Sequence, residues 1–94
     1  YSASKAGVNG MNMPVARELG SEGIRINSIA PGLFETPMTG QLDKNIVESL
    51  VNICEAPRRM GYPTEYAHAC AFLIENAYMN GRVLRLDAAS IMSA

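Results

Sequence analysis

The stretch GIRINSIAPG, residues 23–32, decides the fold of this chain. β-Branched residues recur from position 24 to position 30, and Pro31-Gly32 then ends the run, because both residues favour turns. This pattern predicts a strand over residues 24–30. A second stretch, RVLRLD at residues 82–87, follows an Asn80-Gly81 turn signal and predicts the last strand.

Three helices are predicted around these strands. The first runs over residues 2–19, with Val8, Met11, Val15 and Leu19 at helical spacing. Pro14 lies within this helix and has no N–H to donate to the preceding turn. We therefore expect either a kink there or another hydrogen-bond donor for the carbonyl that the proline leaves without a partner.

The other two helices lie between the strands. One is capped by Asp43 and ended by Pro57, and it carries an apolar stripe made of Ile46, Val47, Leu50, Val51 and Cys54. The other covers about residues 64–76. Its expected buried side is Ala67, Cys70, Ala71 and Ile74, with Tyr66 and Leu73 at the margins.

The element order helix, strand, helix, helix, strand indicates an α/β fold. Two strands joined through helices should be parallel, with a right-handed crossover. Two such strands with a leading helix make a poor independent domain. We therefore expect residues 1–94 to be the C-terminal half of a single, doubly wound Rossmann-type parallel-sheet domain. The opening at Tyr1 without an initiating Met agrees with a fragment.

Composition narrows the class of partner. The 94 residues carry a net charge of -1, so no basic field is available for nucleic acid or an anionic membrane. No apolar run approaches the ~20 residues of a bilayer span. Two cysteines and one histidine make a poor metal site, and we expect no metal. No secretory segment is visible, and cytoplasm and mitochondrial matrix both stay open as locations.

Tyr1 and Lys5 are the candidate chemical pair. Their spacing of four places both side chains on one helix face. A nearby ammonium favours the phenolate, and a phenol so tuned can exchange a proton with an alcohol or carbonyl oxygen. A lysine can also hold a ribose diol. The pair supplies no hydride, so a cofactor must provide that chemistry.

Several motifs in one order carry a resemblance to a known family. They are YSASKAG at 1–7, AREL at 16–19, GIRINSIAPG at 23–32, TPM at 36–38 and NGRVLRLD at 80–87. Together they resemble the second half of the short-chain dehydrogenase/reductase family, over essentially the whole chain. Finer features resemble its type 2 3-hydroxyacyl-CoA dehydrogenase subfamily: MPVAR at 13–17, APGLF at 30–34, EYAH at 65–68, IEN at 74–76 and RLD at 85–87.

The resemblance implies a role for each matching residue. Tyr1 would be the catalytic acid/base, and Lys5 would lower its pKa and bind the nicotinamide ribose. Contacts with the nicotinamide end of NAD would come from four residues after the first strand: Pro31, Gly32, Phe34 and Thr36. Pro31 and Gly32 would form the turn beneath the ring. Residues 37–58 would form a mobile substrate lid.

The implied reaction is the NAD-dependent interconversion of a secondary alcohol and a ketone, on a 3-hydroxyacyl-CoA or a similar apolar substrate. Two alternatives stay open: an NADP-dependent 3-oxoacyl-carrier-protein or other carbonyl reductase, and a non-enzymatic remnant that acts as an assembly module. The resemblance also implies a homo-oligomer, a tetramer or a dimer, when complete. The 94 residues alone are expected to be inactive.

The sequence also departs from the family pattern. Ala88 stands where a glycine usually follows the final aspartate, and residues 52–57 lack the usual apolar-Pro-aromatic-Pro run. A glycine-rich phosphate loop, an acidic residue for the adenosine ribose and the catalytic serine would lie outside these residues. We therefore expect the last turn and the lid to differ from the family pattern.

Overall fold

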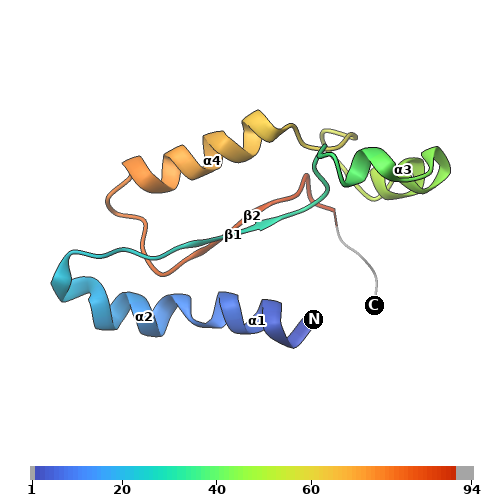
Figure 1. Cartoon of the computed structure of the whole chain (residues 1–94). Helices are drawn as coiled ribbons and strands as arrows, with labels where there is room; N and C mark the ends of the chain where they lie inside the picture. The colour runs from blue at the N-terminus through green and yellow to red at the C-terminus, as the bar shows by residue number, and fades with distance from the viewer. Residues whose placement is uncertain (1, 91–94) are drawn as a thin grey trace.

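The computed structural model describes residues 2–90 and has an α/β architecture (Figure 1). Its elements are α1 (Ser2–Gly10), α2 (Asn12–Leu19), η1 (Gly20–Glu22), β1 (Ser28–Pro31), η2 (Thr39–Gln41), α3 (Lys44–Val51), α4 (Pro63–Glu75) and β2 (Val83–Leu86). β1 and β2 pair in parallel, from Ser28 opposite Val83 to Pro31 opposite Leu86. The predicted α/β class and the parallel pairing are confirmed.

Helices cover both faces of this two-stranded sheet. In Figure 1, α1 and α2 lie along one face, α4 lies along the other, and α3 lies beyond the carboxyl ends of the strands. Parallel strands require this double cover because both of their faces are apolar. The amino-terminal end of α1 lies at the same end of the sheet as the carboxyl ends of β1 and β2.

The first strand is shorter than predicted: β1 starts at Ser28 rather than at residue 24. At residues 26 and 27, just before β1, side chains form hydrogen bonds in place of the strand-to-strand backbone pairing. The Ile26 N–H donates to Asn80 Oδ1 at 3.0 Å, and the Asn27 amide donates to the Met79 carbonyl and accepts from the Arg82 N–H. The local sequence pattern cannot show this, because the segment opposite residues 26 and 27, residues 79–82, is more than fifty positions away in the chain.

The first predicted helix is interrupted at Met11, three residues before Pro14. Met11 keeps helical dihedrals, φ -74° and ψ -21°. Pro14 has no N–H for the Gly10 carbonyl, and its ring crowds that carbonyl. The disturbance expected from the proline therefore falls one turn before it.

α3 begins as predicted and ends earlier. Asp43 caps it, accepting the Asn45 N–H at 3.0 Å, but the helix stops at Val51, well before Pro57. A turn follows and carries Cys54 into the interior, where its side chain is 2% exposed.

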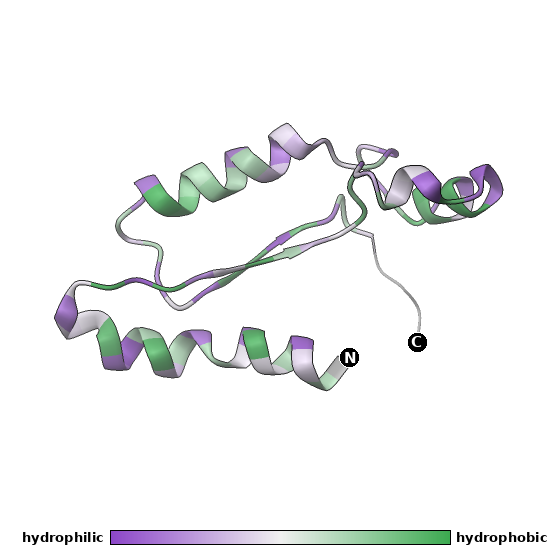
Figure 2. Cartoon of the chain, viewed as in Figure 1, coloured by the Kyte–Doolittle hydropathy of each residue, from purple (hydrophilic) through white to green (hydrophobic). Residues whose placement is uncertain are grey.

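The expected buried side of α4 is wrong in part, since Leu73 was expected only at its margin, and Cys70 and Ala71 are half-buried. Ala69 and Leu73 are its buried residues, whereas Ala67 is exposed and Ile74 is 73% exposed. The buried stripe is set by where the sheet lies, and the apolar composition of α4 allowed more than one stripe. Figure 2 shows apolar colour along most of this helix.

The core within residues 2–90 is small. Its buried apolar side chains are Ala16, Cys54, Ala69 and Leu73. The radius of gyration is 15.4 Å, against about 12 Å for a compact domain of this length. The described residues thus form an open set of layers with much apolar helix surface uncovered. None of the described helices is long and apolar enough to cross a membrane.

Two polar residues join the layers where apolar contact is sparse. Asn12, 2% exposed, donates to the Arg82 carbonyl and accepts from the Ser28 hydroxyl at 2.9 Å, which ties α2 to both strands. On the opposite face, the Arg25 guanidinium donates to the Leu73 and Ile74 carbonyls, each at 2.7 Å. It thereby caps the carboxyl end of α4.

Candidate active site

The candidate site lies where the chain leaves β1. Gly32 continues the pairing, since its N–H donates to the Leu86 carbonyl at 3.0 Å. A Cβ at Gly32 would lie 2.7 Å from Asp87 Cβ and 2.9 Å from Asp87 Cα. The structure therefore gives a packing reason for glycine at this position: the ends of the two strands approach too closely for a side chain.

The next residues are held by a short parallel bridge between Phe34 and Gly61. The Gly61 N–H donates to the Leu33 carbonyl at 2.8 Å, and the Glu35 N–H donates to the Gly61 carbonyl at 2.9 Å. The Phe34 ring covers Gly61 so closely that a Cβ there would lie 2.5 Å from a ring carbon. In such a bridge the N–H and C=O of Phe34 itself point away from Gly61.

Thr36 and Thr39 fix the following turn. The Thr39 hydroxyl accepts the Thr36 N–H at 2.8 Å, and the Thr36 hydroxyl accepts the Thr39 N–H at 3.2 Å. The Thr39 hydroxyl also lies 3.0 Å from the Phe34 carbonyl, to which it can donate. The backbone over residues 33–39 is thus anchored on both sides, by Gly61 and by Thr39.

One cavity brings together all four residues assigned to the nicotinamide end. It measures about 490 Å³, and its walls are Pro31, Gly32, Leu33, Phe34, Thr36, Thr39, Pro63 and Tyr66. Phe34 and Tyr66 meet edge to face, with ring centroids 5.7 Å apart. A flat aromatic ring fits such walls, because they are mostly apolar and carry hydroxyl and backbone groups at a few points.

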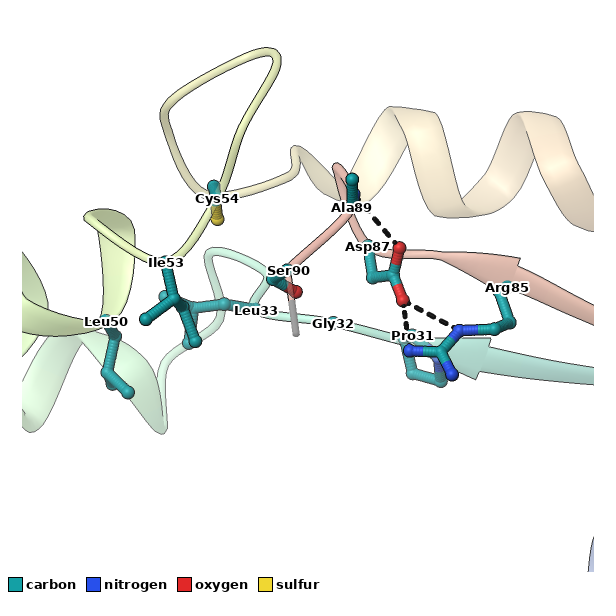
Figure 3. Close-up of a pocket in the computed structure, with 10 residues that line it drawn as sticks. All are labelled: Pro31, Gly32, Leu33, Leu50, Ile53, Cys54, Arg85, Asp87, Ala89 and Ser90. Atoms are coloured by element: carbon teal, nitrogen blue, oxygen red, sulfur yellow. Dashed lines mark hydrogen bonds and ion pairs between the residues drawn. The ribbon is translucent and has the colours of Figure 1, made fainter. Parts of the chain in front are cut away.

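A second cavity, of about 840 Å³, shares Pro31, Gly32 and Leu33 with the first (Figure 3). Its other walls are Leu50, Ile53, Cys54, Arg85, Asp87, Ala89 and Ser90. Arg85 donates twice to Asp87 Oδ2, at 2.6 and 2.9 Å. This cavity combines apolar residues from α3 and the turn after it with a charged pair at the end of β2, so it could hold an apolar chain beside a polar group.

Of the candidate pair Tyr1 and Lys5, only Lys5 lies among the residues that the structure describes. Tyr1 lies outside the described residues, so the proposed pair has no described geometry. Lys5 lies in α1 with an exposed side chain, and it does not line either cavity. Among residues 2–90, no group of three or more His, Cys, Asp or Glu residues could hold a metal ion.

The loop before α4 holds a charged cluster that the sequence analysis did not single out. Arg59 donates to both carboxylate oxygens of Glu65, at 2.7 and 3.1 Å, and its guanidinium lies 4.1 Å from the Tyr62 ring centroid. The Arg59 hydrogen bonds, followed by one from the Tyr62 N–H, lower the pKa of Glu65 to about 2. Hydrogen bonding to Glu65 raises the pKa of Arg59. A helix start with Glu three residues after its cap was the one sequence signal for this cluster.

The turn after β2 contains Ala88, the residue that departs from the family's sequence pattern. Ala88 and Ala89 take left-handed backbone conformations, with φ of 51° and 57°. Glycine adopts this region without the cost that an alanine Cβ brings. The turn is nevertheless fixed, because the Ala88 carbonyl accepts the Glu55 N–H at 2.9 Å and the Asp87 carbonyl accepts the Ser90 N–H.

Ligand cavities at the carboxyl ends of parallel strands, with helices on both sheet faces, define the doubly wound class of nucleotide-binding α/β proteins. A family model described as enoyl-(acyl carrier protein) reductase matches residues 1–88. A crystal structure of 3-hydroxyacyl-CoA dehydrogenase type-2 from Mycobacterium avium superposes with a TM-score of 0.94 at 43% identity, over 99% of this chain and 36% of that one.

Curated relatives agree with this match. The 3-hydroxyacyl-CoA dehydrogenase type-2 of Mus musculus is 48% identical over 89 residues, which are 95% of this chain and 34% of that protein. A 3-oxoacyl-[acyl-carrier-protein] reductase of Thermotoga maritima is 42% identical, over 93% of this chain and 36% of its own length. The chain belongs to the short-chain dehydrogenase/reductase family, and it spans about a third of the length of these relatives.

Proposed function

We propose that these residues are the C-terminal part of an NAD-dependent oxidoreductase that interconverts a secondary alcohol and a ketone. The single observation that carries the proposal is the cavity that unites Pro31, Gly32, Phe34 and Thr36 beside the larger cavity. A cofactor ring and a substrate would then meet at residues 31–33. The substrate class, a 3-hydroxyacyl-CoA, is supported by the names of the Mus musculus and Mycobacterium avium relatives.

Each residue has a distinct part in this proposal. When bound, NAD would supply the hydride acceptor. The Tyr1 phenolate would take the proton from the substrate hydroxyl and become the neutral phenol, and the Lys5 ammonium would lower the pKa of the Tyr1 side chain and bind the ribose. Pro31, Gly32, Phe34 and Thr36 would orient the nicotinamide, and Leu50 and Ile53 would exclude water from the acyl chain.

The first experiment uses the product of the whole open reading frame that contains these residues, here called the complete protein. We expect the frame to include a glycine-rich phosphate loop and a serine shortly before Tyr1. The Tyr1→Phe variant should lose about 100- to 10,000-fold in kcat, the usual contribution of a general acid or base, with the KM for NAD nearly unchanged. Tyr78→Phe is the matched control, because Tyr78 is fully exposed and lies outside both cavities. Near-normal turnover of Tyr1→Phe would remove the proposed role.

A second candidate is an NADP-dependent 3-oxoacyl-carrier-protein reductase or another carbonyl reductase. The specific observation in its favour is the match to the Thermotoga maritima reductase and to an acetoacetyl-CoA reductase of Synechocystis, 44% identical. Rates measured with NAD and NADP, on hydroxyacyl-CoA and oxoacyl substrates, separate the two candidates. Absence of turnover with every pair would favour the assembly module instead.

A further inference from the structure

The loop of residues 59–62 is held by one carboxylate. Glu65 accepts two hydrogen bonds from Arg59 and one from the Tyr62 N–H, the last at 2.8 Å. Arg59 also donates to the Met60 carbonyl at 2.9 Å. Arg59 and Tyr62 are thus both tied to Glu65, and Gly61 lies between them. Two parallel hydrogen bonds between a guanidinium and a carboxylate fix direction as well as distance.

Gly61 passes this constraint to the candidate cofactor cavity. Both of its backbone groups bond to residues 33 and 35, and the Phe34 ring packs on its Cα face. Phe34 in turn packs against Tyr66, the neighbour of Glu65 in α4. A path of direct contacts therefore runs from the Arg59–Glu65 pair to the backbone that lines the cavity.

We propose that Arg59 and Glu65 are positioning residues, which fix Gly61 and through it hold the backbone of residues 33–35 in the orientation that binds the nicotinamide end of the cofactor. This inference rests on the proposed function, because it assigns the cavity to NAD. Neither residue lines the cavity that holds Phe34 and Thr36. Both line a smaller cavity of about 250 Å³ with Gly61 and Phe34, so their effect reaches the cofactor cavity through these two residues.

The test compares Glu65→Gln with Glu75→Gln in the complete protein. Glu75 is exposed at the other end of α4, so the second variant makes the same chemical change away from the loop. Glu65→Gln should raise the KM for NAD about five- to tenfold, since small misplacement of binding groups is costly. kcat should change less than threefold, because the proposed catalytic residues Tyr1 and Lys5 belong neither to this loop nor to residues 33–35. Arg59→Lys should act in the same direction, since an ammonium cannot form the paired bonds.

Amide hydrogen exchange supplies a measurement that does not need activity. In Glu65→Gln, exchange at the Gly61 and Glu35 N–H groups should speed up at least fivefold, whereas exchange at Gly32, bonded to β2, should stay constant. Glu75→Gln should leave all three sites unchanged. Unchanged exchange at Gly61 and Glu35 in Glu65→Gln would overturn the proposal whether or not the enzyme is active.

Acid titration gives the sign of the charge effect. The pKa of Glu65 is lowered from 4.5 to about 2, so its stabilising contribution is present above pH 4.5 and is lost as pH falls through 2. The difference in urea midpoint between wild type and Glu65→Gln should therefore shrink from pH 4.5 to pH 2.

If wild type lacks dehydrogenase activity, the proposed function fails and the cofactor role with it. An active wild type with an unchanged KM for NAD in Glu65→Gln overturns the positioning role alone.

Discussion

Replacing Ala88 by glycine should stabilise the protein, which is the opposite of the usual effect of an Ala→Gly change. Ala88 has a φ of 51° after β2, and its carbonyl bond to the Glu55 N–H holds it there. A left-handed conformation costs an L-residue about 1–2 kcal/mol. Glycine removes that cost but gives the unfolded chain more freedom, which is worth about 0.4–1 kcal/mol. The net expectation is about 0.5–1 kcal/mol of added stability.

The assay is urea unfolding of the complete protein, with the free energy of unfolding taken at equal slope for each variant. Ala67→Gly is the matched control. Ala67 is exposed inside α4, where glycine should cost about 1 kcal/mol through helix propensity alone. The two identical substitutions should thus shift stability in opposite directions. A loss of stability in Ala88→Gly as large as that in Ala67→Gly would refute the left-handed turn.

Two further substitutions test the packing around the site and the α4 cap. Gly61→Ala should destabilise the protein by about 1–3 kcal/mol, because the new Cβ must displace the Phe34 ring. Gly40→Ala is the control and should change stability little, since nothing lies within 4 Å of its Cβ. Equal urea midpoints for the two variants would contradict the close approach of Phe34 to Gly61. Arg25→Lys should cost about 1–3 kcal/mol, because one ammonium cannot replace four guanidinium bonds to carbonyls, two in the last turn of α4 and two in the segment just after it. Faster amide exchange in the last turn of α4 is the measurement that checks this.

The candidate site was predictable in part. The family resemblance assigned Phe34 and Thr36 to the cofactor, and both follow the end of β1, for which Pro31-Gly32 is a local signal. The Arg59–Glu65 pair and Gly61 were missed as parts of the site. Their importance comes from contact with residues 33–35, more than twenty positions earlier, and no periodicity records such a contact.

The sequence by itself determined the helix and strand types and their order, the Asp43 cap, and the Asn80-Gly81 bend before β2. Each of these depends on the conformational preferences of a few neighbouring residues. The tertiary structure alone decided which stripe of α4 is buried, and where β1 starts. It also decided that glycine at 32 is required by the approach of Asp87. These features depend on contacts with residues from other elements, which are distant in the sequence. The same apolar helix or strand could pack in several ways, and the positions of the neighbouring elements decide which one is adopted.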